Sequence, residues 1–128
     1  MKVSFDFDGT LDRPVLQEYA KELLARGIEV WIVTARLSDE EAPSDSWNLD
    51  LYKVAIEVGI DLNNVVFTPH KDKYHFFKGK DFVWHVDDSW TEIGLINRFT
   101  KMRGISVFGT CMWKEKCERE LIKRKHEK

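Results

Sequence analysis

Two carboxylates stand two residues apart near the N-terminus, in the string Asp6-Phe7-Asp8-Gly9-Thr10. If both lie at the end of a strand, their side chains leave the same side of the sheet. One carboxylate of such a pair can attack a phosphoryl group while the other moves protons, and hard carboxylate oxygens suit a divalent cation. The alternative is a strand that simply ends in an Asp-Gly turn. However, four specified positions at about one in twenty each arise by chance in roughly one such chain per thousand.

A second acidic pair, Asp87-Asp88, follows the apolar run Phe82–Val86. The next residues, Ser89 and Glu92, have the spacing of a capping box and predict that a helix begins there. Ser89 already supplies the helix cap, so the acidic pair is not needed for that role.

Other side chains could bind a phosphoryl group. Thr34 ends the apolar run Val30–Thr34, and its hydroxyl can donate a hydrogen bond to a phosphoryl oxygen. Arg36 could equally bind a substrate phosphate with two hydrogen bonds or form a structural salt bridge. Four lysines precede the run that leads to the second acidic pair, and each could supply an ammonium group: Lys71, Lys73, Lys78 and Lys80.

The elements that must position these residues alternate between short β-type runs and helical patterns. This alternation predicts an α/β fold with a mostly parallel five-stranded sheet. We expect helices at 14–26, 46–58, 89–102 and 113–128. Gly27, Gly59 and Gly104 would end the first three of them, in that order. Residues 37–45 form a loop and 71–80 a short helix or turn. Strands are expected at 3–7, 28–33, 65–68, 82–86 and, at the sheet edge, 105–108.

Composition excludes several classes of protein. The 128 residues suit one domain, and the net charge of −2 gives no domain-wide basic surface for nucleic acid. No apolar run approaches 18 residues, so we expect no membrane partner. The only cysteines, Cys111 and Cys117, form no disulfide framework, which favours a reducing cytoplasm. Their spacing to the histidines, His85 included, does not predict a zinc site.

The string from Asp6 to Thr10 resembles the first motif of the haloacid-dehalogenase-like (HAD) phosphohydrolases. Three further motifs follow in that family's order. Val30–Thr34 is similar to the second motif, and Asp87-Asp88 to the acidic pair of the fourth. Lys73 stands where the family usually has its motif lysine, with Lys71 as the alternative.

This resemblance implies a HAD-like Rossmannoid three-layer sandwich, with the first strand central, the second strand on one side and the fourth on the other. Asp6, Thr34 and Asp87 would then meet at the carboxyl ends of the strands, where open α/β sheets bind ligands. Many members carry a cap domain, but the segments between these motifs are too short for one. We therefore expect residues 1–128 to form a single, capless HAD-like phosphatase domain.

The resemblance also implies an activity, that of a magnesium-dependent phosphoric monoester hydrolase. Asp6 would attack phosphorus and form an aspartyl-phosphate, and Asp8 would act as general acid and then as general base. Mg²⁺ would be held by Asp6, the main-chain carbonyl of Asp8, and Asp87, with support from Asp88. Thr34 and Lys73 would hold the phosphoryl oxygens.

Within that family, the chain resembles the phosphatase half of polynucleotide kinase/3′-phosphatases, through Thr34-Ala35-Arg36, Lys73 and Asp87-Asp88. Trp47 and Trp90 follow loops beside the expected site and can stack on bases. The expected substrate is therefore a nucleotide or a single-stranded nucleic-acid 3′-phosphate end. One alternative is a catalytically silent phosphate-binding or interaction protein with the same fold, although binding alone does not need the second acid. A phosphotransferase, which usually needs a cap to exclude water, is less favoured.

Overall fold

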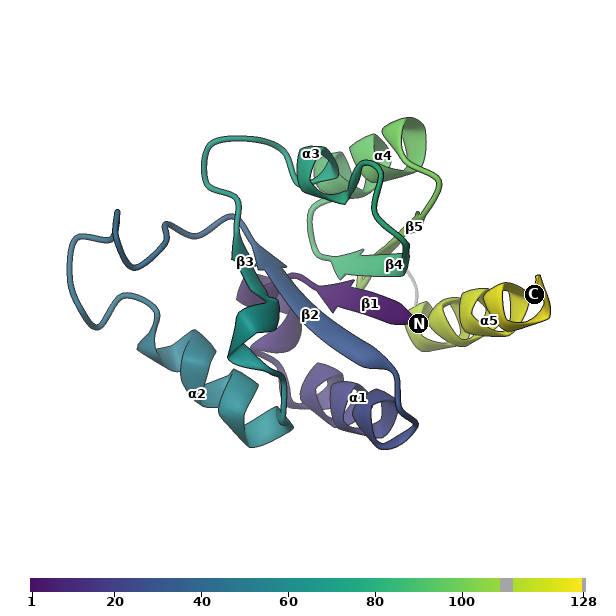
Figure 1. Ribbon diagram of the computed structural model, residues 1–128, viewed down its shortest axis with the longest axis horizontal. Coiled ribbons are helices and arrows are strands. Elements are labelled where there is room, and N and C mark those ends of the chain that lie inside the picture. Colours follow the sequence, from purple (N-terminus) through teal and green to yellow (C-terminus); the bar gives the residue numbers. More distant parts are fainter. Residues whose placement is uncertain (109–111, 128) are drawn as a thin grey trace.

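The computed structural model describes residues 1–108 and 112–127, so the expectations for Cys111 and Lys128 lie outside the described residues. A five-stranded, all-parallel sheet forms the centre, with strand order β3-β2-β1-β4-β5 (Figure 1). The predicted α/β class is confirmed, as are the central first strand and the fifth strand at an edge. The strands are β1 (Lys2–Phe5), β2 (Glu29–Thr34), β3 (Val65–Phe67), β4 (Phe82–Asp87) and β5 (Arg103–Ser106).

Helices cover both faces of the sheet (Figure 1). One face carries α1 (Pro14–Ala25), α2 (Leu49–Val58) and α5 (Trp113–His126), and the other carries α3 (Tyr74–Phe77) and α4 (Trp90–Phe99). Two short turns complete the chain: the π-helical turn η1 (Phe7–Leu11) after β1, and the 3-10 turn η2 (Leu62–Asn64) before β3. All the strands run parallel, so their carboxyl ends share one edge of the sheet.

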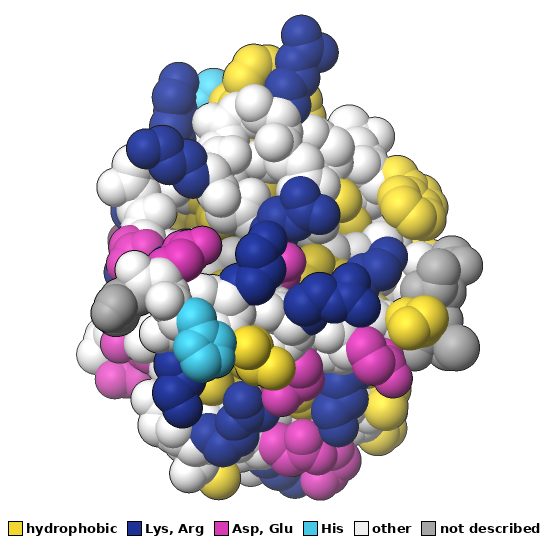
Figure 2. All heavy atoms as spheres, turned by 90° about the vertical axis from the view of Figure 1, so that its right-hand side faces the viewer, with side chains coloured by type: hydrophobic (Ala, Val, Ile, Leu, Met, Phe, Trp, Pro, Cys, Tyr) yellow, Lys and Arg dark blue, Asp and Glu magenta, His cyan; other side chains and the backbone are white. Residues whose placement is uncertain are grey.

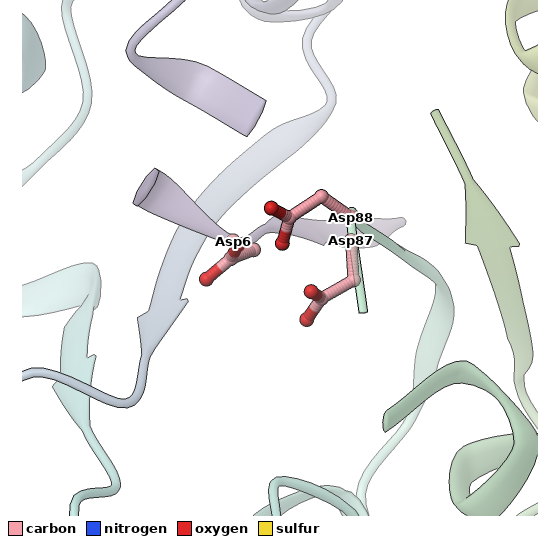
Figure 3. A group of neighbouring side chains, drawn as sticks. All are labelled: Asp6, Asp87 and Asp88. Atoms are coloured by element: carbon pink, nitrogen blue, oxygen red, sulfur yellow. The ribbon is translucent and has the colours of Figure 1, made fainter. Parts of the chain in front are cut away.

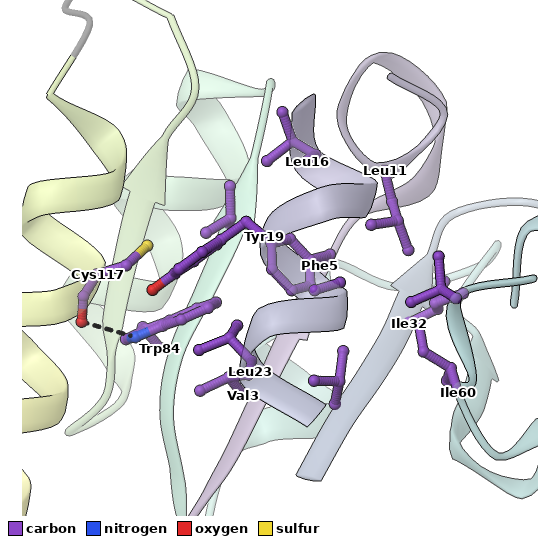
Figure 4. Close-up of a cluster of buried hydrophobic side chains, with 14 of the residues drawn as sticks. Val3, Phe5, Leu11, Leu16, Tyr19, Leu23, Ile32, Ile60, Trp84 and Cys117 are labelled. Atoms are coloured by element: carbon purple, nitrogen blue, oxygen red, sulfur yellow. Dashed lines mark hydrogen bonds between the residues drawn. The ribbon is translucent and has the colours of Figure 1, made fainter. Parts of the chain in front are cut away.

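The larger core lies between the sheet and α1, α2 and α5 (Figure 4). Phe5 and Trp84 meet edge to face with ring centroids 5.4 Å apart, and Tyr19 of α1 stacks on Trp84. The indole of Trp84 is fully buried, and its Nε1–H donates to the carbonyl of Cys117 at 3.1 Å. This bond satisfies the one polar atom of the ring and ties α5 to the sheet.

The smaller core lies on the opposite face. Along β2, Val30 and Ile32 face the larger core, whereas Trp31 and Val33 face the smaller one. Such a strand is apolar on both sides, as expected for a parallel sheet covered by helices on each face. The buried members of the smaller core are Val33, Phe77, Phe82, Ile96 and Met102.

Several predicted boundaries were wrong. α4 ends at Phe99 rather than 102, because Thr100 leaves the helical backbone and its hydroxyl donates to the carbonyl of Ile96 at 2.7 Å. β5 begins at Arg103 rather than at 105, so Gly104 lies within the strand and does not end a helix. A Cβ at Gly104 would stand 3.0 Å from the carbonyl oxygen of Ile93, so the glycine lets α4 pack tightly on the sheet.

The helix predicted from residue 46 begins at Leu49. Asn48 is buried and its amide donates to the carbonyl of Leu37 at 3.0 Å and to Asp39 at 2.9 Å. These bonds hold Asn48 in the loop that follows β2. The first strand is also shorter than expected, since β1 ends at Phe5 and the chain turns directly into η1.

Candidate active site at the carboxyl edge of the sheet

Asp6 follows β1 and starts the tight turn η1. Its main-chain N–H still donates to the carbonyl of Val86 at 2.8 Å, which fixes it beside the end of β4. Gly9, inside the turn, has a φ of 77°, a conformation that favours glycine. A Cβ at Gly9 would also collide with the carboxylate of Asp88. Gly9 therefore allows the first and second acidic motifs to approach each other.

Three carboxylates from these two strand ends meet in one group (Figure 3). One oxygen each from Asp6, Asp87 and Asp88 lies within 4.8 Å of the others. Asp6 and Asp87 are buried, while Asp88 is partly exposed. Carboxylate oxygens are hard ligands, which are the donor atoms that a divalent cation such as Mg²⁺ prefers.

The ammonium of Lys73 lies against two of the three carboxylates. Its Nζ is 2.8 Å from Oδ1 of Asp6 and 2.6 Å from Oδ2 of Asp87, and the side chain is only 3% exposed. The main-chain N–H of Lys73 donates to Glu92 of α4 at 2.9 Å, which anchors the start of α3. With all three acids ionised, one ammonium leaves two negative charges uncompensated, the charge of one divalent cation.

The other lysines considered from the sequence do not share this position. Lys71, Lys78 and Lys80 are exposed, and Lys80 donates to the carbonyl of Phe76 at 2.6 Å. The structure therefore brings Lys73, rather than Lys71, to the acidic group.

The local environment gives the carboxyl groups of Asp6, Asp87 and Asp88 different pKa values. Burial, opposed by Lys73 and reinforced by the charge of Asp87, raises the pKa of Asp6 to about 8. Burial acts on Asp87 in the same direction, but hydrogen bonds and charge from His85 and Lys73 hold the pKa of that carboxyl well below its ordinary range. The pKa of Asp88 is raised, mainly by burial. Thus, without a cation, Asp87 is the ionised partner of Lys73 and Asp6 retains a proton more readily.

Asp8 lies apart from this acidic group. Its carboxylate is 58% exposed and receives two hydrogen bonds from Arg36, one from Nε at 2.9 Å and one from Nη2 at 2.8 Å. The expectation that Asp6 and Asp8 leave one side of a strand assumed a strand through Phe7. Because β1 ends at Phe5, the alternation of a strand does not govern Asp8.

Arg36 holds its place through several contacts. It donates to both carboxylate oxygens of Asp50, at 2.7 and 2.9 Å, and to the carbonyl of Trp47 at 3.2 Å. Its guanidinium also lies over the ring of Phe7, 4.9 Å from the centroid. The sequence left two roles open for Arg36, phosphate binding and a structural salt bridge. The structure shows salt bridges to Asp8 and Asp50, and Asp8 is one of the two predicted catalytic residues.

Thr34 is buried at the carboxyl end of β2, the neighbour of β1. Its Oγ1 accepts a hydrogen bond from the main-chain N–H of Arg36 at 3.2 Å. Its carbonyl accepts from both the main-chain N–H and the hydroxyl of Thr68, at 2.7 and 3.0 Å. Thr34 is thus fixed at the same sheet edge as Asp6 and Asp87.

Sequence reasoning missed two buried polar residues beneath the acidic group. His85 of β4 lies with Nε2 2.7 Å from Oδ2 of Asp87, and with Nδ1 2.7 Å from Oγ of Ser4 in β1. Both side chains are fully buried. The signal that could have found them is a polar residue in each of two apolar strands, at positions that the sheet pairs.

Exposed aromatic side chains flank the carboxyl edge. Trp90, the first residue of α4, is 62% exposed, and Trp47 is 45% exposed. A groove of about 300 Å³ runs beside Trp90. Its lining combines aromatic and basic side chains with one acidic side chain: Trp90, Phe108, Arg103, Lys116, Arg119 and Glu120.

A hollow of about 870 Å³ lies away from this chemistry, at the end of the molecule where the strands begin. Figure 2 views that end and shows lysine and arginine side chains gathered over it. The C-terminal ends of α3, α4 and α5 border this hollow. Basic residues there compensate the negative ends of the helix dipoles. The acidic group at the opposite end is therefore the better candidate for a functional site.

A scan against models of known protein families finds no match, and a search of curated proteins finds no significant match. Among the helices that the structure describes, none has both the length and the apolar composition needed to cross a membrane.

Proposed function

We propose that this chain is a magnesium-dependent phosphatase of the haloacid-dehalogenase-like type, which hydrolyses phosphomonoesters through a phosphoryl group carried on Asp6. The observation that carries the proposal is the buried ammonium of Lys73 in contact with Asp6 and Asp87, with Asp88 in the same carboxylate group. The sheet order supports it, because β1 and β4 are neighbours and end at the same edge.

In the first half of the proposed reaction, a carboxylate oxygen of Asp6 attacks phosphorus, and the bond from phosphorus to the alcohol oxygen breaks. Asp8 gives a proton to that leaving oxygen. In the second half, Asp8 takes a proton from a water molecule whose oxygen attacks phosphorus. The bond between Asp6 and phosphorus then breaks and releases phosphate.

The remaining residues act on charge and orientation. The Lys73 ammonium and the Thr34 hydroxyl hold the phosphoryl oxygens as negative charge develops. Lys73 also favours the ionised form of Asp6, which is the form that attacks. Mg²⁺ held by Asp6, Asp87, Asp88 and the main-chain carbonyl of Asp8 would neutralise the phosphoryl group.

For the substrate, we propose a nucleotide or a single-stranded nucleic-acid 3′-phosphate. The supporting observations are the exposed indole of Trp90, three residues after Asp87, and the basic groove beside it. An exposed indole can stack on a base, and lysine or arginine side chains can attract the adjoining phosphates. The net charge of −2 makes this attraction local to the groove.

The proposal is tested with purified protein and a generic aryl phosphate. Activity should vanish with EDTA and return with added Mg²⁺, whereas Asp6→Asn should be inactive even with Mg²⁺ present. Activity that survives thorough chelation would contradict the metal assignment. A folded protein that binds inorganic phosphate with Mg²⁺ but hydrolyses no phosphomonoester would instead favour the catalytically silent alternative.

A further inference from the structure

A chain of hydrogen bonds lies under the acidic group, and the reaction proposed above does not use its lower part. Ser4 of β1 and His85 of β4 face each other between neighbouring strands, where the other fully buried residues of β1 are apolar. A buried polar group costs free energy unless it is hydrogen-bonded, so each polar side chain here needs a partner. The structure supplies those partners in a single line from Ser4 to His85 to Asp87.

The direction of each bond follows from the chemistry of its atoms. Because the ionised carboxylate of Asp87 can only accept, the bond of 2.7 Å requires His85 Nε2 to carry a hydrogen. In the neutral ring, Nδ1 is then an acceptor, and the hydroxyl of Ser4 is its donor. Ser4 therefore selects the tautomer that points a donor at Asp87.

The two oxygens of Asp87 have different surroundings. Oδ2 accepts from His85 at 2.7 Å and from Lys73 at 2.6 Å, which uses the two acceptor positions of that oxygen. Oδ1 accepts the main-chain N–H of Ser89 at 3.0 Å, which uses one of its two acceptor positions. Oδ1 is thus the oxygen with capacity left for a cation.

We propose that His85, oriented by Ser4, is a positioning residue that fixes the Asp87 carboxylate so that Oδ1 is presented to the divalent cation. The inference rests on the proposed function, because it assumes a cation among Asp6, Asp87 and Asp88. His85 acts through Asp87 alone. Partners that orient a metal ligand in this way typically change metal affinity 10–100-fold when they are removed, as an order of magnitude.

The test is Mg²⁺ binding by isothermal titration calorimetry on the full chain, without substrate. His85→Leu keeps a similar volume but has no donor, and we expect it to weaken Mg²⁺ binding by about 10–100-fold. His85→Gln retains an amide donor at a similar reach, and its affinity should stay within a few-fold of wild type. The matched control is His75→Leu, at an exposed histidine of α3, which should leave affinity unchanged.

Thermal unfolding in EDTA separates a folding defect from a binding defect. If His85→Leu does not fold, Ser4→Ala carries the test, because it keeps the imidazole but removes the hydroxyl that sets its tautomer. Its Mg²⁺ affinity should fall several-fold. Equal affinity in Leu, Gln and wild-type proteins, or unchanged affinity in Ser4→Ala, would overturn the positioning role.

The outcomes also separate this inference from the proposed activity. A wild-type protein that binds Mg²⁺ and shows the expected ranking, but hydrolyses no phosphomonoester, would refute the phosphatase and leave the positioning role intact. A wild-type protein that binds no Mg²⁺ would overturn both. Hydrolysis that requires Mg²⁺, with affinity insensitive to His85→Leu, would refute the positioning role alone.

Discussion

Arg36 donates two parallel hydrogen bonds to the carboxylate of Asp8, from Nε to Oδ2 at 2.9 Å and from Nη2 to Oδ1 at 2.8 Å. The same guanidinium binds both carboxylate oxygens of Asp50, so one cation connects the turn after β1 to the start of α2. Two parallel bonds fix the plane of a carboxylate as well as its position. The exposed Asp8 side chain is therefore held in one orientation at the edge of the site.

We predict that Arg36→Ala lowers kcat by about tenfold or more, since a proton carrier displaced by about 1 Å can lose up to 10²-fold in rate. Arg36→Lys should not restore the rate, because an ammonium cannot make the paired bonds. Asp50→Asn, which disturbs only the outer contact, should have a smaller effect. Steady-state kinetics on an aryl phosphate measures all three, and a wild-type kcat in Arg36→Ala would assign Arg36 a purely structural role.

The second prediction compares two lysines two residues apart. Lys73→Met keeps the length of the side chain but removes the ammonium from Asp6 and Asp87, and should lower kcat by about 10²–10³-fold. Lys71→Met, at an exposed position, should change kcat less than twofold. Thermal unfolding of both variants serves as the folding control. The reverse ranking would transfer the role to Lys71.

The third prediction concerns pH and the metal. Because the pKa of Asp6 is raised to about 8, Mg²⁺ binding below that pH must displace a proton. The apparent affinity should therefore strengthen by up to about tenfold per pH unit as pH rises toward 8, and then level off. Calorimetry in buffers of different ionisation enthalpy should detect nearly one proton released per Mg²⁺ at pH 7 and almost none at pH 9. Affinity that is constant from pH 6 to 9 would contradict the assignment.

The same shift gives a signed effect on the stability of the metal-free protein. Asp6 has a folded pKa above its unfolded value of about 4, so the stability it contributes is present below pH 4 and is lost as pH rises through about 8. Between pH 5 and 9, wild-type protein in EDTA should lose more unfolding free energy than Asp6→Asn. Equal pH profiles in urea denaturation would contradict the buried, protonated acid.

The fourth prediction tests the substrate class. Stacking of one base on Trp90 is worth about 1–3 kcal/mol, and 1.4 kcal/mol corresponds to a factor of ten. We expect kcat/KM for a nucleoside monophosphate or a 3′-phosphorylated oligonucleotide to exceed that for glucose 6-phosphate by at least about tenfold. Trp90→Ala should remove that preference. The matched control is Phe99→Ala, at an exposed aromatic at the far end of the same helix, which should preserve it. Equal or better turnover of the sugar phosphate would remove the nucleic-acid interpretation.

The parallel sheet could be predicted because its signals are local. Apolar runs of strand length alternate with helical spacing, and glycines such as Gly59, with a φ of 99°, mark helix ends. Gly104 shows the limit of this reasoning. Its role is set by the backbone of Ile93, which packs against it across the fold, and not by its own neighbours in sequence. The pattern therefore misplaced both the end of α4 and the start of β5.

The candidate site likewise contains residues that the sequence could predict and residues that depend on the fold. Motif spacing placed Asp6, Asp87 and Asp88 correctly at strand ends, and the resemblance favoured Lys73, which lies against two of these acids. A polar residue in each of two apolar strands could have drawn attention to Ser4 and His85. That the two side chains meet depends on a strand register with an irregularity between Lys2 and Ser4, which the sequence pattern does not give. The predicted capping box forms only in part. Ser89 caps α4, but the Glu92 carboxylate accepts a hydrogen bond from the main-chain N–H of Lys73 and so supports the site.

The central claim is that Asp6 carries the phosphoryl group during turnover. The most direct measurement is intact-protein mass spectrometry after rapid acid quench, with Mg²⁺ and excess aryl phosphate. We predict an adduct of one phosphoryl group on wild-type protein, at a position that peptide mapping assigns to Asp6. Asp8→Asn should slow both half-reactions by about 10²–10⁴-fold, and Asp6→Asn should form no adduct. Near-normal turnover by Asp6→Asn, or an adduct on any other residue, would contradict the account.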